Sequence, residues 1–98
     1  MTRQVNLSVN DAPIPVDYFV AGFIDHTVRG MLAALEGTGE IKTLDITIEG
    51  DKVAINLNGA EVSINFFVGK IIKNTVVGML SSLKGVSEIN RVKITIGD

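Results

Sequence analysis

Residues 17–37 read DYFVAGFIDHTVRGMLAALEG, and this stretch decides the fold that the sequence predicts. Pairs of apolar residues recur along it every three to four positions, which is the pattern of a helix with a broad apolar side. Asp17 is a favourable N-cap and Gly37 a favourable C-cap. The stretch therefore predicts a helix of about 20 residues, roughly 30 Å long, which can cross a whole small sheet.

The same pattern recurs at residues 65–85, NFFVGKIIKNTVVGMLSSLKG, which begin 48 positions later. An alignment of each position with the one 48 residues further on needs no gap over positions 5–49, and 18 of these 45 positions are identical. Chance does not produce such agreement, so the sequence predicts an internal duplication. We expect residues 1–98 to form a single domain from two repeats, at about 4–50 and 52–98, which share one core.

Stretches with alternating apolar and polar residues flank each helix pattern. Residues 53–57 alternate in this way, which is the period of a half-buried strand. Asn58-Gly59 follows and favours a two-residue hairpin turn, because such a turn needs a positive φ at both central residues. Asn10-Asp11 stands at the equivalent place in the first repeat. Each repeat therefore predicts a hairpin before its helix and a further strand after it.

The second strand of the first hairpin contains Pro13 and Pro15, which cannot donate to a ladder. That strand must lie at a sheet edge or be a loose extension. Two α+β alternatives follow: two ββαβ units or, if residues 10–16 and 58–64 form no second strands, the βαββαβ order of ferredoxin-like folds. Both are two-layer sandwiches, in which a mostly antiparallel sheet carries two long helices on one face.

The composition restricts the classes of protein to which the chain can belong. Cysteine is absent, which excludes disulfides, thiolate metal sites and a cysteine nucleophile. No apolar run approaches the roughly 18 residues of a spanning helix, and the N-terminal residues lack the apolar run of a signal peptide. We therefore expect a soluble cytoplasmic protein. The mean hydropathy of +0.35 is high for so small a domain and predicts that another subunit covers part of its surface.

Signatures of enzymes and of phosphate-binding loops are missing from the sequence. His26 is the single histidine, and one imidazole without a second histidine or a cysteine is a poor metal site. All five aromatic residues fall in the helix patterns and none on the predicted sheet face, and the pI is about 5.3, which argues against nucleic-acid binding. We expect no catalytic residue, no metal and no cofactor.

Several polar residues near the turns and on the helices are weak candidates for a small-ligand site. They are His26, Asn74, Asn10, Asn58 and Gly59. His26 and Asn74 occupy equivalent positions of the two repeats, and the other three belong to the predicted hairpin turns. The turns lie at the polar ends of the helices, where a cleft could form between the repeats.

Two glycines stand in the middle of the helix patterns, at Gly30 and Gly78, although glycine costs about 1 kcal/mol there relative to alanine. Together with Ala34 and Ser82 they make small-xxx-small edges that let two helix backbones approach closely. We therefore predict a helix contact or an interface at these four residues. A close approach of a ligand to the helix backbone is the alternative.

Opposite charges occupy equivalent positions of the repeats, Asp25 with Lys73 and Glu36 with Lys84. They are either solvated side chains or complementary faces that steer one subunit onto another.

The leading hypothesis for function is a non-enzymatic interaction module that self-associates. The alternative is a small-ligand-binding regulatory domain with a site between the two repeats. The expected partner is a second copy of the chain or another protein, with no nucleic acid and no membrane.

Overall fold

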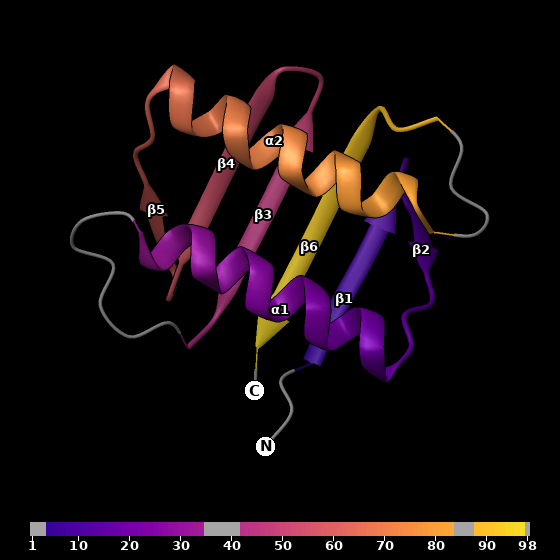
Figure 1. The fold of residues 1–98 in the computed structure, drawn as a ribbon. Helices are drawn as coiled ribbons and strands as arrows, with labels where there is room; N and C mark the ends of the chain where they lie inside the picture. Colours follow the sequence, from indigo (N-terminus) through magenta and orange to yellow (C-terminus); the bar gives the residue numbers. More distant parts are fainter. Residues whose placement is uncertain (1–3, 35–41, 84–87, 98) are drawn as a thin grey trace.

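The computed structural model describes residues 4–34, 42–83 and 88–97, which form one sheet and one layer of helices (Figure 1). In chain order the elements are β1 (Gln4–Val9), β2 (Ala12–Ile14), α1 (Tyr18–Ala33), β3 (Leu44–Glu49), β4 (Lys52–Leu57), β5 (Ala60–Val62), α2 (Phe66–Ser81) and β6 (Arg91–Gly97). The fold is therefore α+β, as predicted. Because β2 and β5 are strands, the ββαβ alternative describes the chain and a bare βαββαβ order does not.

The six strands form an open sheet in the order β2-β1-β6-β3-β4-β5, with every neighbouring pair antiparallel. The prediction that the proline-containing strand lies at an edge is confirmed, because β2 is an outermost strand. Strands offset by 48 residues stand at mirror positions in this order: β1 with β4, β2 with β5, and β3 with β6. The central pair thus joins the last strand of each half.

Both hairpin turns have the geometry that the sequence predicts. Asn58 and Gly59 have φ values of 53° and 84°, and Asn10 and Asp11 have values of 53° and 68°. The turns set the strand register, so Leu57 pairs with Ala60 and Val9 with Ala12. These short-range predictions are therefore confirmed.

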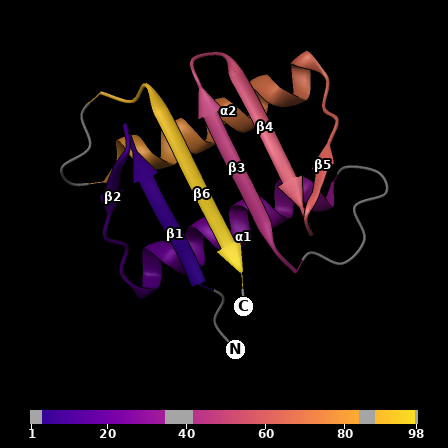
Figure 2. The ribbon, with the colours of Figure 1, turned by 180° about the vertical axis from the view of Figure 1, so that it is seen from behind.

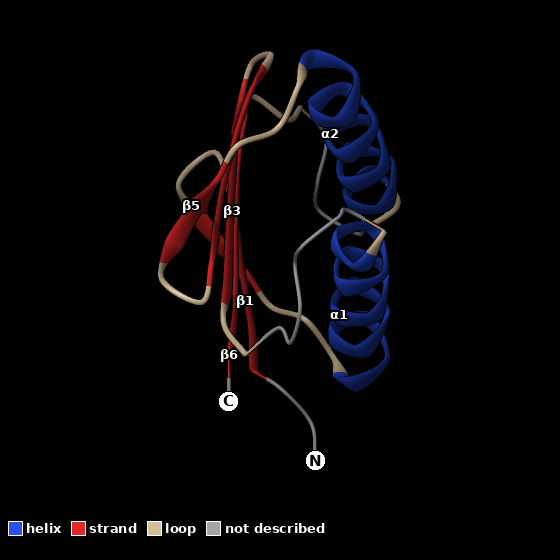
Figure 3. Ribbon diagram, turned by 90° about the vertical axis from the view of Figure 1, so that its left-hand side faces the viewer, coloured by secondary structure: helices blue, strands red, loops and turns tan. Residues whose placement is uncertain are grey.

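The two helices lie side by side on one face of the sheet and run in opposite directions (Figures 1 and 3). Asp17 and Asn65 are their N-caps, as predicted, and the side chain of each accepts a hydrogen bond of 2.8 Å from the backbone N–H three residues on. The described residues leave the opposite face of the sheet uncovered (Figure 2). The core therefore lies between the helix layer and a single sheet face.

The helices are shorter than the sequence pattern predicts. Each has 16 residues and ends at Ala33 or Ser81, so its length is roughly 24 Å. Leu32 and Leu80 are the last buried residues of the two helices, and each helix ends near the sheet edge opposite its start (Figure 1). Among the described residues, no strand lies beyond that edge for a further helical turn to cover. The predicted C-caps, Gly37 and Gly85, lie outside the described residues.

Candidate interaction surface

The side of the helix layer that points away from the sheet exposes large apolar residues. Phe19 and Phe23 are 73% and 51% exposed on α1, and Phe67 and Ile71 are 68% and 45% exposed on α2. The apolar stripe that the sequence predicts includes these four residues, but only the row around Ile24 and its α2 equivalents is buried in the core. The helix pattern is therefore wider than the sheet can cover.

The mid-helix glycines lie on the same outward side, because Phe19, Phe23, Gly30 and Ala34 fall within about 60° of one another around a helix of 3.6 residues per turn. Both Gly30 and Gly78 are exposed, and a Cβ added at either would meet no heavy atom within 4 Å. Within the part of the chain that the structure describes, neither glycine therefore makes a close helix–helix contact. An interface at these positions stays a prediction.

We call this surface the outer helix face and define it by four residues from each helix. They are Phe19, Phe23, Gly30 and Ala34 of α1, and Phe67, Ile71, Gly78 and Ser82 of α2. The charged residues of the two helices, Asp25, Arg29, Lys70 and Lys73, lie at least about 80° away from the glycines around the helix axis. The eight residues that define the outer helix face are thus aromatic, aliphatic or small, while the exposed polar side chains of His26 and Asn74 lie on the same side, about 40° from Gly30 and Gly78.

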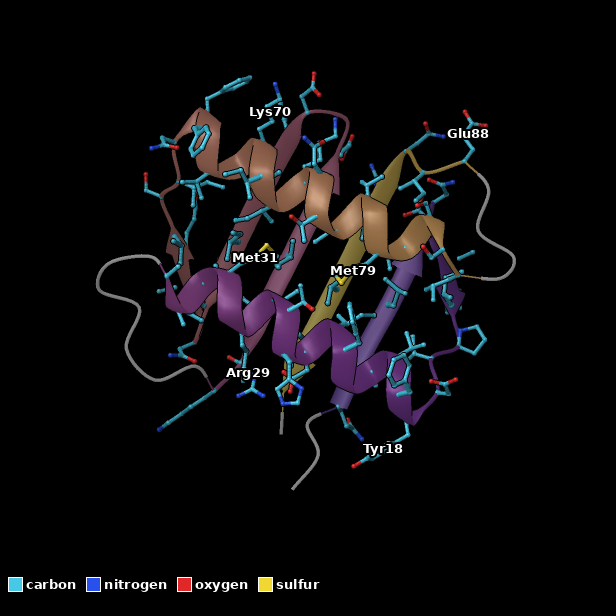
Figure 4. All side chains as sticks on the ribbon, in the orientation of Figure 1. Tyr18, Arg29, Met31, Lys70, Met79 and Glu88 are labelled. Carbon is cyan, nitrogen blue, oxygen red and sulfur yellow. The ribbon has the colours of Figure 1, made fainter. Side chains whose placement is uncertain are left out.

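A groove with a volume of about 530 Å³ lies between the two helices at the start of α1 and the end of α2. Its walls are Phe19, Val20, Phe23 and Ile24 from α1 and Gly78, Met79, Leu80, Ser82 and Leu83 from α2. Figure 4 shows the side chains of Met31 and Met79 between the helices. Both halves of the chain thus contribute to this groove, and none of its lining residues is charged.

A second, smaller cleft of about 400 Å³ lies beside the start of α2 and includes Asn74. Here Nζ of Lys73 donates a hydrogen bond of 2.7 Å to Oδ1 of Asp51. This bond, together with the positive charge of Lys73, holds the pKa of Asp51 below its usual value. Lys73 therefore pairs with Asp51 and not with Asp25, which pairs with Arg29. Glu36 and Lys84 lie outside the described residues.

His26 lies on an exposed part of α1, with its Nδ1 atom 2.9 Å from the carbonyl oxygen of Gly22. No group of three His, Cys, Asp or Glu residues that could hold a metal ion occurs in residues 4–34, 42–83 and 88–97. The structure places His26 and Asn74 on different helices, where both are exposed. It does not bring them together with the turn asparagines.

The turn asparagines join the two halves of the chain. Oδ1 of Asn58 accepts hydrogen bonds from the backbone N–H groups of Lys42 (2.7 Å) and Thr43 (3.0 Å), just before β3. Oδ1 of Asn10 does the same for Asn90 and Arg91, at 2.8 and 3.0 Å, where β6 begins. Two of the predicted ligand candidates thus fix the start of a strand that belongs to the other half.

Replacing Asn58 with alanine is expected to lower the free energy of unfolding by about 1.5 kcal/mol, because it removes two accepted hydrogen bonds and strains a residue at positive φ. Asn58→Gly keeps the backbone relaxed and should cost only about 0.5–1 kcal/mol. Urea unfolding of both variants measures the two contributions. If Asn58→Ala is as stable as the wild type, the hydrogen bonds that Asn58 accepts from Lys42 and Thr43 contribute nothing to stability.

The uncovered face of the sheet is polar, as the sequence predicts. Asn6, Asn56 and Lys93 are exposed on it, and no aromatic residue lies in any described strand. No helix among the described residues is long and apolar enough to cross a membrane.

Comparison of the chain with protein-family models, with curated proteins and with solved structures finds no match. The outer helix face differs from the polar face of the sheet because it exposes Phe19, Phe23, Phe67 and Ile71.

Proposed function

We propose that the chain is a non-enzymatic self-association module, in which the outer helix face of one copy packs against that of a second copy. The observation that carries this proposal is the exposure of Phe19, Phe23, Phe67 and Ile71 on one side of the helix layer. Burial of apolar surface stabilises an association by about 25 cal/mol per Å², and aromatic residues are the usual anchors of interfaces. A surface without charges can be buried without desolvating unpaired ions.

The outer helix face is built from two similar helices, and a second copy can meet it through a twofold axis. In a twofold dimer, the same patch of both subunits meets, so the patch must be complementary to itself. Equivalent residues of two antiparallel helices build this patch, and the molecule measures 36 × 33 Å in its two longer dimensions. A stable interface needs about 800 Å² from each partner. The helix layer is large enough to supply this area.

We also propose that an internal duplication produced the two similar helices. Support comes from the 48-residue offset of the identical positions, the strand order that reads alike from both edges, and the paired N-caps and turn asparagines. Without the edge strands, the order of elements is the βαββαβ order of ferredoxin-like folds. The resemblance to ferredoxin-like folds that we propose concerns only this order of elements.

A small-ligand-binding regulatory domain is the second candidate function, and the groove between the helices favours it. Its volume of about 530 Å³ is within the range of ligand pockets, roughly 300–1,000 Å³. Because both halves line the groove and no charged residue does, the ligand would be an uncharged apolar molecule. A ligand there and a second copy on the outer helix face would compete for the same surface.

Sedimentation velocity on the whole chain tests self-association. The wild type is expected to shift from the 10.5 kDa monomer to a dimer as its concentration rises through the micromolar range. A Phe19→Asp/Phe67→Asp variant should remain monomeric and folded, because both residues are largely exposed and charges would have to be buried at the interface.

The matched control is Tyr18→Asp/Phe66→Asp. These aromatic residues are 81% and 82% exposed, but they lie about 100° around the helix from Phe19 and Phe67. The control variant should dimerise like the wild type. A wild type that stays strictly monomeric at high micromolar concentration would refute self-association and favour the ligand-binding candidate.

A further inference from the structure

We infer that, in the self-associated pair, an aromatic side chain from the first half of one of the partner's helices fills the groove beside Gly78. This inference rests on the proposed self-association and specifies how the two copies fit together. The groove is open, apolar and adjacent to the outer helix face, since Phe19, Phe23, Gly78 and Ser82 belong to both. A partner that covers the face must therefore either fill the groove or leave it empty.

The side chains that each helix places on the outer helix face become smaller from its start to its end. The first half of each helix carries large residues, Phe19 and Phe23 on α1, and the second half carries small ones, Gly30 and Ala34. The same gradient runs along α2, from Phe67 to Ser82. Because the helices are antiparallel, each end of the face combines the large half of one helix with the small half of the other (Figure 1).

A twofold axis can bring two copies face to face in two ways that lay a helix of one copy over a helix of the other. An axis along the helices lays α1 of one copy over α2 of the other, and an axis across them lays each helix over its own equivalent. The paired helices run antiparallel in both arrangements. Both therefore place the large half of one helix over the small half of the helix beneath it, with Phe19 or Phe67 of the partner over Gly78.

The chemistry of the groove suits an aromatic ring. The ring centroids of Phe19 and Phe23 lie 6.1 Å apart, and the ring planes are tilted by 43°. This arrangement leaves ring edges and faces available to a third ring. Met79 lines the groove, and its flexible thioether packs well against aromatic rings. Gly78 leaves open space where any other residue would place a side chain. The groove can therefore act as the pocket for an interface anchor.

The test replaces both glycines with leucine, in the variant Gly30→Leu/Gly78→Leu, and measures dimerisation by sedimentation equilibrium. The new side chains would occupy the places of the partner's rings, so the dimer dissociation constant should rise by at least tenfold. Folding of the single chain should not suffer, since a Cβ at either position would meet no heavy atom within 4 Å and leucine is the better helix former. Urea unfolding at low protein concentration checks this point. Ala54→Leu adds a leucine to the uncovered sheet face and should leave dimerisation unchanged.

The possible outcomes separate the inference from the proposed function. If the wild type dimerises and the leucine variant dimerises within threefold of it, the inference is wrong while self-association stands. If the wild type is a monomer, both fall. Should the leucine variant not fold, Gly30→Ala/Gly78→Ala keeps the test decisive, because a methyl group on each glycine must also weaken a dimer whose rings rest there. Adding Phe19→Ala and Phe67→Ala to the leucine variant should restore part of the dimerisation.

Discussion

Replacing Ile46 or Ile94 with alanine is expected to lower the free energy of unfolding by about 2–5 kcal/mol, the usual cost of a cavity in a well-packed core. Both side chains are fully buried. They face each other across the central pair of strands, β3 and β6, which lies beneath both helices. Since this pair joins the two halves of the chain, the cavity opens where the halves share their core.

Urea unfolding monitored by circular dichroism measures the loss. The control variants are Thr47→Ala and Thr95→Ala, which alter the opposite side of the same two strands and should cost less than about 1 kcal/mol. Because Ile46 and Ile94 are neighbours, the double variant makes one larger cavity, and its loss should differ from the sum of the two single losses. A loss below about 1 kcal/mol for Ile94→Ala would mean that the helices do not close over the centre of the sheet.

The local features of this fold are predictable from short stretches of sequence. Asn58-Gly59 fixes a turn because few other residues adopt a positive φ, and the turn then fixes the register of the strands beside it. Asp17 and Asn65 cap the helices with their own side chains. Each of these features depends on residues fewer than five positions apart, so no knowledge of the tertiary structure is needed.

The lengths of the helices and the exposure of their apolar residues depend on the sheet and are harder to predict. Phe19 and Phe67 continue the apolar pattern that Ile24 and Ile72 share, yet only the isoleucines are buried. How much of the pattern is buried depends on how much of each helix the six strands can cover. Ile24, Val28 and Leu32 recur every four residues, and this spacing distinguishes the buried row from the exposed apolar residues of the helix.

The candidate surface was only partly visible in the sequence. Gly30 and Gly78 indicate an unusual helix surface, but the sequence does not show whether they face another helix of the same chain or solvent. The role of Asn10 was hidden because its partners, at residues 88–91, are about 80 positions away along the chain. Such long-range partners follow from the strand order, in which the hairpin of one half lies beside the last strand of the other.

Replacing Arg29 with methionine is expected to lower the free energy of unfolding by about 2–3 kcal/mol. Arg29 donates two hydrogen bonds to Asp25, from Nε to Oδ1 at 2.9 Å and from Nη2 to Oδ2 at 2.8 Å. The side chain of Asp25 is only 9% exposed, so the variant would leave a buried carboxylate without a partner. Loss of one partner of a buried pair costs about 3–5 kcal/mol. The expected value is lower because Arg29 is itself 32% exposed and solvent screens the pair.

The double variant Asp25→Leu/Arg29→Met should recover most of this loss, because apolar residues can replace a buried ion pair at little cost. Lys73→Met removes the ion pair between α2 and Asp51, whose side chain is 93% exposed, and should change stability little. Urea unfolding of these variants measures both effects. If Arg29→Met and Lys73→Met lower the free energy of unfolding equally little, the burial of Asp25 adds no cost.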